Sequence, residues 1–170
     1  LVSSYLNGLD AYRKALDKAK MAGTDLRPGS KTGEPRVLLG RGFHLVENAS
    51  ERFFPVRVVW TSGPSCTIVP LDDTEDIKLV FREGRGKQLD ASHAAKFTVW
   101  RGATQIKVGF EPLEYASFFR LILPKGTYKA YENLEIRADW PLFEVGPGAP
   151  RQRRKQGILL CESGVELIQM

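Results

Sequence analysis

The chain has 170 residues, of which 42% are hydrophobic and 26% are charged, with 16 glycines and 10 prolines. A chain of this size can bury roughly 70% of its unfolded surface in one core, so it needs no metal or disulfide to fold. This composition excludes collagens, disordered chains and coiled coils, and no apolar run approaches the roughly 18 residues of a membrane-spanning helix.

Lys and Arg outnumber Asp and Glu by 25 to 20, which gives a formal net charge of +5 at pH 7. The isoelectric point near 9.3 is typical of proteins that bind polyanions, provided that the cations gather on one face. Cys66 and Cys161 lie far apart in apolar runs without metal-ligand spacing. We therefore predict reduced core thiols, with no disulfide or zinc site, and an intracellular location. Because the chain starts at Leu1, we expect a fragment or a processed product.

An amphipathic helix is predicted for residues 1–23, followed by a polar linker at 24–35 that is rich in Pro and Gly. Its apolar stripe recurs at three- and four-residue steps and consists of Val2, Tyr5, Leu6, Leu9, Tyr12 and Leu16. Gly8 interrupts this helix at a cost of about 1 kcal/mol relative to Ala. The stripe packs either on the rest of the chain or on a partner.

Residues 36–170 are predicted to form a β-rich domain. Short apolar runs alternate with turn residues at 37–39, 43–46, 56–60, 66–71, 77–82, 97–101 and 105–110. Turns at 62–65 and 102–103 predict antiparallel hairpins between neighbouring runs. Further along, residues 112–123 suit a short helix that leads into a strand. Strands are also expected at 128–132 and 134–138, and a final hairpin pairs 158–162 with 165–169.

The predicted fold class is therefore mainly β (α+β). It is an antiparallel β-barrel or sandwich with an N-terminal amphipathic helix and one short internal helix.

Strand alternation predicts a basic outer face, because alternate side chains of a half-buried strand share a face. In four of the runs, the outward charged residues are all cations, namely Arg57, Lys78, Arg82 and Lys107, with Arg101 at a strand end and Trp100 beside them. Like charges opposite one another destabilise a sheet, so a single sign indicates an anionic partner. Loop carboxylates, such as those of the acidic cluster at 72–76, are the alternative partners.

Two Gly-Arg-Gly elements, at 40–42 and 84–86, contribute Arg41 and Arg85, and Lys87 follows the second. Glycine allows backbone N–H groups to converge on an anion, and arginine binds phosphate oxygens in a bidentate manner. Neither element continues into a P-loop, and plain hairpin turns are the alternative. The basic run at 151–155 adds Arg153 and Arg154, either as a phosphate-contacting arm or as a solvated loop.

No motif predicts catalysis, a cofactor or a metal site. Asp90 and His93 can share a helical face, but no nucleophile motif accompanies them. The acidic cluster at 72–76 lacks the spacing of a calcium loop. A nuclease-like set of Glu83, Asp90 and Lys96 is the least supported alternative.

Together, these patterns predict a nucleic-acid-binding module without catalytic activity, in which the cations contact phosphates and Trp100 stacks on a base. The type of nucleic acid is left open. The alternative is a structural or assembly subunit that binds a protein partner, or a second copy of itself, through the apolar stripe at residues 2–16. No membrane association is expected.

Overall fold

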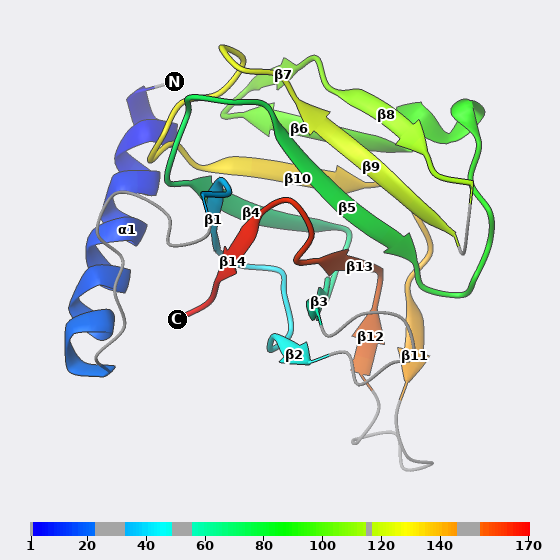
Figure 1. Cartoon of the computed structure of the whole chain (residues 1–170), viewed down its shortest axis with the longest axis horizontal. Coiled ribbons are helices and arrows are strands. Elements are labelled where there is room, and N and C mark those ends of the chain that lie inside the picture. Colours follow the sequence, from blue (N-terminus) through cyan, green and yellow to red (C-terminus); the bar gives the residue numbers. More distant parts are fainter. Residues whose placement is uncertain (1, 23–32, 49–55, 115–116, 146–153) are drawn as a thin grey trace.

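The computed structural model describes residues 2–22, 33–48, 56–114, 117–145 and 154–170 (Figure 1). The helices are α1 (Val2–Ala22) and the short 3₁₀-helix η1 (Ala91–Lys96). The strands are β1 (Arg36–Leu39), β2 (Glu47–Asn48), β3 (Arg57–Trp60), β4 (Ser65–Pro70), β5 (Ile77–Glu83), β6 (Phe97–Arg101), β7 (Thr104–Ile106), β8 (Gly109–Pro112), β9 (Phe118–Leu123), β10 (Leu134–Ala138), β11 (Phe143–Val145), β12 (Arg154–Gln156), β13 (Ile158–Cys161) and β14 (Glu166–Ile168).

Within the described residues, the strands form two six-stranded sheets and a separate two-stranded ribbon. Sheet 1 has the order β14-β1-β4-β10-β6-β7, and sheet 2 has the order β2-β3-β13-β5-β9-β8. Neighbouring strands are antiparallel except β14 and β1, which are parallel. The β11–β12 ribbon extends below the sheets in Figure 1. The sheets form a sandwich and not a closed barrel, so the mainly β prediction is confirmed in its sandwich form.

The core lies between the two sheets and is built from alternate residues of their strands. Phe81, Phe119 and Leu121 of sheet 2 and Val99 and Ile136 of sheet 1 are almost fully buried. The rings of Phe81 and Phe119 stack with their centroids 5.5 Å apart. Since burial of each such side chain contributes about 1.5–3 kcal/mol, this alternation determines which residues of every strand face outward.

Helix α1 covers one half of the outer face of sheet 1. Its Ala15 is buried in a cluster with Leu38 of β1, Val69 of β4 and Ile168 of β14. Tyr12, on the same side of the helix, stacks at a tilt on Tyr131, with 4.7 Å between ring centroids. Tyr12 and Leu16 of the predicted stripe therefore pack on the body of the chain itself. Among the described residues, no helix covers the other half of that outer face, over β10, β6 and β7 (Figure 1).

Gly8 is required by the packing of α1. A Cβ atom at this position would lie 2.1 Å from the carbonyl oxygen of Tyr131, so the helix can approach the loop before β10 only because position 8 has no side chain. Among the described residues, no helix has the length and apolar character needed to cross a bilayer.

Three predicted connections are wrong because the chain crosses between the sheets. The turn at 62–65 leads from β3 in sheet 2 to β4 in sheet 1, and the predicted strand at 105–110 is divided into β7 in sheet 1 and β8 in sheet 2. The last two strands also separate, since β13 joins sheet 2 and β14 pairs with β1. The hairpin around 102–103 is confirmed by the antiparallel pairing of β6 with β7.

The short helix predicted at the start of 112–123 is also wrong, whereas the strand predicted to follow it is confirmed as β9. The described part of this range contains the paired strands β8 and β9, because Phe119, Leu121 and Leu123 enter the core at a period of two. Its residues 115–116 lie outside the described residues. The short internal helix is instead η1, which Asp90 caps. Residues 128–132 form turns and not a strand, and of 43–46 only Phe43 forms a bridge, to Thr61.

Candidate nucleic-acid interface

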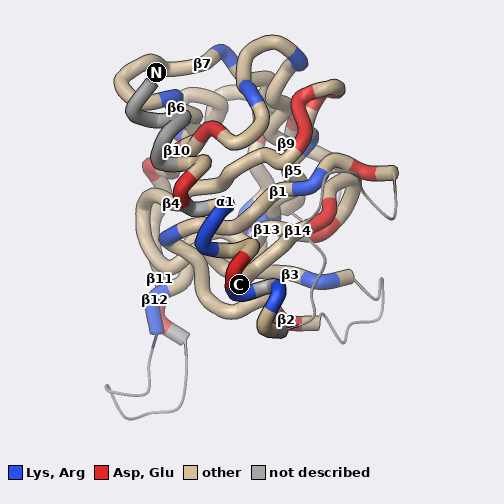
Figure 2. The backbone as a smooth tube through the Cα atoms, turned by 90° about the vertical axis from the view of Figure 1, so that its left-hand side faces the viewer, with Lys and Arg blue, Asp and Glu red and all other residues tan. Residues whose placement is uncertain are grey.

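The predicted cations do not share one face. Lys78 and Arg82 lie on the outer face of sheet 2, beside the outward Val80 and opposite the inward Leu79 and Phe81. Trp100 lies on the outer face of sheet 1, because its neighbour Val99 is in the core. In a sandwich these two faces point in opposite directions. Positions of both signs also interleave on the side that carries α1 (Figure 2).

Arg57 has the opposite orientation to the one predicted. Val59, which shares its parity, is fully buried in the core, whereas Val58 and Trp60 lie on the outer side of sheet 2. The guanidinium of Arg57 donates to Glu162 Oε2 and to the carbonyl oxygen of Leu167, both at 3.1 Å. Arg57 therefore links β3 to the β13–β14 region, and the single-signed outer face predicted from alternation loses one of its members.

Several other residues that were predicted to contact nucleic acid lie apart from one another. Arg101 donates to both carboxylate oxygens of Glu132 at 2.8 and 3.0 Å, and both side chains are largely buried. This arrangement makes Arg101 a structural residue. The guanidinium of Arg154 lies 3.9 Å from Glu47 Oε2 of β2, and Lys107 is exposed between β7 and β8. Arg153 lies outside the described residues.

Two predicted cations, Arg85 and Lys87, meet in an open cleft of about 450 Å³. The cleft lies between the loop after β5 and the segment after β10, and its remaining lining residues are Lys96, Asp139, Trp140 and Pro141. Lys96 Nζ is 3.4 Å from Asp139 Oδ2, and about half of the Lys96 side chain is exposed. The lining thus holds three cations and one carboxylate, and the buried carboxylate of Glu83 pairs with Arg85, which leaves the site an excess of one positive charge.

Glu83 holds the loop at 84–87 in place from beneath. Its side chain is 1% exposed, and its Oε2 atom accepts the backbone N–H groups of Arg85 at 2.8 Å and Lys87 at 2.7 Å. The φ of +83° at Gly86 allows the loop to turn back on this carboxylate. The predicted convergence of backbone N–H groups on an anion therefore occurs at 84–87, but the anion is the protein's own Glu83. Ligand contacts are left to the side chains.

The second oxygen of Glu83 accepts the Trp140 indole N–H at 3.1 Å and the Arg85 Nε–H at 3.3 Å. Burial by itself raises the pKa of this carboxyl, but hydrogen bonds from Lys87, Trp140 and Arg85 together hold the pKa below its usual value of 4.5. Glu83 is therefore ionised near neutral pH and fixes both walls of the cleft.

Trp140 forms the aromatic wall of the cleft. Its ring packs on Phe97 at a centroid distance of 5.6 Å and meets the edge of His93 at 5.4 Å. Lys87 Nζ lies 5.4 Å from the ring centroid. His93 and Asp90 close the start of η1 as a reciprocal capping box. This pair therefore has a structural explanation, and it positions the helix that ends at Lys96.

The acidic cluster at 72–76 also has structural partners. Asp73 accepts the backbone N–H of Ala130 at 3.2 Å, and Asp76 accepts that of Lys125 at 2.8 Å. These bonds hold the turns on either side of Tyr128. In the part of the chain that the structure describes, no three His, Cys, Asp or Glu side chains are grouped to hold a metal ion.

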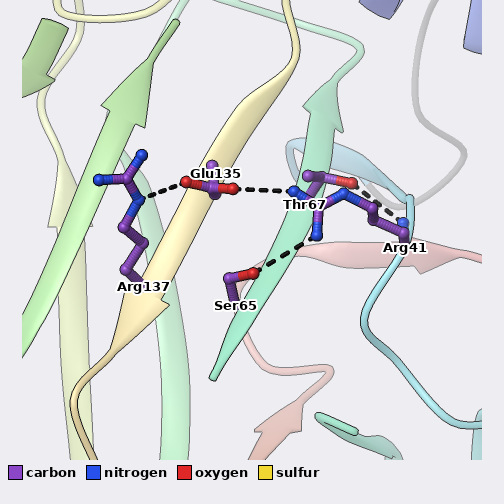
Figure 3. A network of polar contacts seen from close by, with 5 residues as sticks. All are labelled: Arg41, Ser65, Thr67, Glu135 and Arg137. Carbon is purple, nitrogen blue, oxygen red and sulfur yellow. Dashed lines mark hydrogen bonds and ion pairs between the residues drawn. The ribbon is translucent and has the colours of Figure 1, made fainter. Parts of the chain in front are cut away.

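A polar network occupies the half of the outer face of sheet 1 that α1 leaves open (Figure 3). Glu135 of β10 is at its centre and pairs with Arg41 at 2.8 Å and with Arg137 on its other side. Arg41 also contacts Ser65 Oγ at 3.4 Å. The guanidinium of Arg137 lies 4.2 Å from the ring centroid of Trp100. The structure thus brings the predicted Arg41 and Trp100 onto one surface, joined by Glu135 and Arg137.

Sequence patterns did not predict Trp140, Arg137 or the organising role of Glu83. Glu83 continues the inward alternation of Ile77, Leu79 and Phe81, which was the available signal for a buried carboxylate. The sequence places Lys96 only in the nuclease-like set with Glu83 and Asp90. Its neighbour in the cleft, Trp140, is 44 residues further along the chain, and no local pattern connects the two.

A scan against protein-family models, a search of curated proteins and a search of solved structures found no match to this chain.

Proposed function

We propose that this protein binds nucleic acid and that the cleft formed by Arg85, Lys87, Lys96 and Trp140 holds its phosphate groups. The observation that carries the proposal is the gathering of three cations around one electropositive cleft with an aromatic wall. Lysine and arginine that neutralise phosphates release condensed counterions, which is the main source of affinity for a polyanion. Arginine can also bind two phosphate oxygens at once.

The cations of the cleft are partly exposed, and Arg85 and Lys96 are each paired with a carboxylate, of Glu83 and of Asp139. The Arg85 side chain is 46% exposed, and that of Lys96 is 49% exposed. Among the described residues, no carboxylate lies within ion-pair distance of Lys87, whose ammonium is placed over Trp140. Because the backbone of the loop is fixed by Glu83, binding need not order it, which lowers the entropic cost of association.

We assign no catalytic step to the cleft. The oxygens of its buried carboxylate, Glu83, accept four hydrogen bonds from the surrounding loop and from Trp140. A general base or metal ligand would need a free oxygen lone pair aimed at the ligand. The alternative of an assembly subunit draws less support, since Tyr12, Ala15 and Leu16 of α1 already pack on sheet 1.

The test is fluorescence anisotropy with labelled single-stranded DNA, duplex DNA and RNA of equal length, titrated between about 50 and 200 mM salt. The cleft variant combines Lys87→Glu with Lys96→Glu. The matched control combines Lys78→Glu with Lys125→Glu, two exposed lysines outside the cleft. Both variants lower the net charge equally, so a difference between them reports position and not overall charge.

We expect the wild-type protein to bind with a steep dependence on salt. The cleft variant should bind more weakly, and its slope of log affinity against log salt should be shallower by roughly 1.5, the contribution of two phosphate contacts. The control should keep most of the wild-type slope. Absence of wild-type binding at the lowest salt would overturn the proposal, as would equal losses in the two variants.

A further inference from the structure

The geometry points to a single-stranded ligand that runs from the cleft onto the open half of sheet 1 and stacks a base at Arg137 and Trp100. This inference rests on the proposed function and adds to it the class of nucleic acid and the path of the strand. It rests on strand register, ring geometry and charge.

Strands β6 and β10 join the cleft to the open face. Asp139, in the cleft, donates its backbone N–H to the carbonyl oxygen of Lys96 at 2.8 Å. The ladder continues from there, with Arg137 opposite Thr98 and Glu135 opposite Trp100. Trp100 is four residues from Lys96, or about 13 Å along an extended chain. At the spacing of about 3.4 Å per nucleotide in a stacked strand, this length matches about four nucleotides.

Trp100 is positioned as a platform. Its indole N–H donates to Thr98 Oγ1 at 2.9 Å, which fixes the plane of the ring on the outer face. The guanidinium of Arg137 lies over the ring at 4.2 Å, and the Arg137 side chain is 49% exposed. A base can stack on the guanidinium plane, or it can replace the guanidinium on the indole while Arg137 turns to a phosphate.

The charge of the open face suits this occupant. Arg41 and Arg137 flank the single carboxylate of Glu135, and the Arg41 side chain is 64% exposed. Helix α1 occupies the neighbouring half of the face over Leu38 and Val69, so it forms a boundary on one side of the path. The free faces of unpaired bases are accessible to Trp100, whereas a duplex hides them within its stack, so the platform favours single strands.

The test measures affinity for a labelled oligothymidylate of about eight nucleotides, for one of about two nucleotides and for a duplex of about twenty base pairs. The variants are Trp100→Ala and Arg137→Gln. The matched control is Phe118→Ala, because Phe118 forms a similar pair with Arg82, at 5.9 Å, on the outer face of sheet 2. Thermal unfolding establishes that each variant is folded.

We expect Trp100→Ala to weaken binding of the longer oligothymidylate by about 5- to 150-fold, the range for loss of one stacked base. Arg137→Gln should weaken it in the same direction. Binding of the short oligothymidylate and the duplex should change little, and Phe118→Ala should bind as the wild type does. If Trp100→Ala does not fold, Arg137→Gln, which alters an exposed side chain, gives the answer alone.

Unchanged affinity in the folded variants, together with a loss in the Lys87 and Lys96 variant, would overturn the path and leave the proposed function standing. Equal affinity of the wild type for duplex and single strand would overturn the preference for single strands. Absence of binding to every probe would instead overturn the proposed function on which this inference rests.

Discussion

Replacement of Glu83 by Gln tests the organisation of the cleft. The glutamine has one carbonyl oxygen, which can keep the two short bonds from the backbone N–H groups of Arg85 and Lys87. Its amide NH₂ then faces the Trp140 indole N–H and the Arg85 Nε–H. Because the NH₂ group is itself a donor, it cannot accept these two hydrogen bonds. A lost bond to a charged acceptor costs about 1.5–3 kcal/mol, and the two retained bonds weaken without the charge. With two such bonds lost, we expect the free energy of unfolding to fall by about 3–6 kcal/mol at neutral pH.

Urea denaturation of the wild type, Glu83→Gln and the exposed control Glu114→Gln measures this difference. The folded-state pKa of Glu83 lies below its usual value of 4.5, so its ionised form stabilises the fold above that value. This contribution is lost as the pH falls through the lower, folded-state pKa. The deficit of Glu83→Gln should therefore shrink as the pH is lowered below 4.5. A variant as stable as the wild type at neutral pH, or a deficit that does not change in acid, would refute the reasoning.

Three further predictions concern the body of the fold. Burial raises the pKa of the Cys66 thiol to about 12 and that of the Cys161 thiol to about 11. A disulfide reagent at mildly alkaline pH should therefore modify neither thiol until urea unfolds the protein. Rapid labelling of the folded protein would contradict this prediction. Arg101→Met should lower the free energy of unfolding by about 3–5 kcal/mol by leaving the carboxylate of Glu132 buried without its partner. In a double-mutant cycle, adding Glu132→Gln to Arg101→Met should restore much of the lost free energy of unfolding. If the effects of the two single substitutions simply add, the two side chains are not coupled. Gly8→Ala should lower the thermal midpoint, because overpacking costs about 1–3 kcal/mol and outweighs a helix-propensity gain of about 1 kcal/mol. A raised midpoint would show that the helix does not pack so closely.

The alternation of apolar residues predicted most strands and their inward sides. Ile77, Leu79 and Phe81 enter the core as expected, and so do Phe97 and Val99. Strand parity is a local property, set by side chains that alternate every residue, and it can therefore be obtained from a single sequence.

The assignment of strands to sheets could not be obtained in this way. Arg82 and Trp100 both point outward, but one lies on sheet 2 and the other on sheet 1, so their outward directions are opposite. Sequence parity contains no information about which sheet a strand joins. The prediction of a single basic face combined residues that lie on the outer faces of two different sheets.

The candidate site depended on long-range contacts for the same reason. The loop of Arg85 and Lys87 was recognised from its glycines, but its partner Trp140 approaches from beyond β10. The joining group is Glu83, whose burial follows from strand parity and whose four donors come from both segments. A carboxylate that continues an apolar alternation into a Gly-Arg-Gly turn is a pattern worth examining in other sequences.

The parallel pairing of β14 with β1 has a consequence for the order of folding. Val37 lies opposite Leu167, so this edge of sheet 1 joins parts of the chain that are 130 residues apart. Contacts between such distant segments slow folding, because a long loop must close before they form. On the ribosome, β1 can pair with β4 early, but its pairing with β14 has to wait until residues 166–168 have been made. Helix α1 packs on a cluster that includes Ile168, so its burial is complete only after β14 has been made.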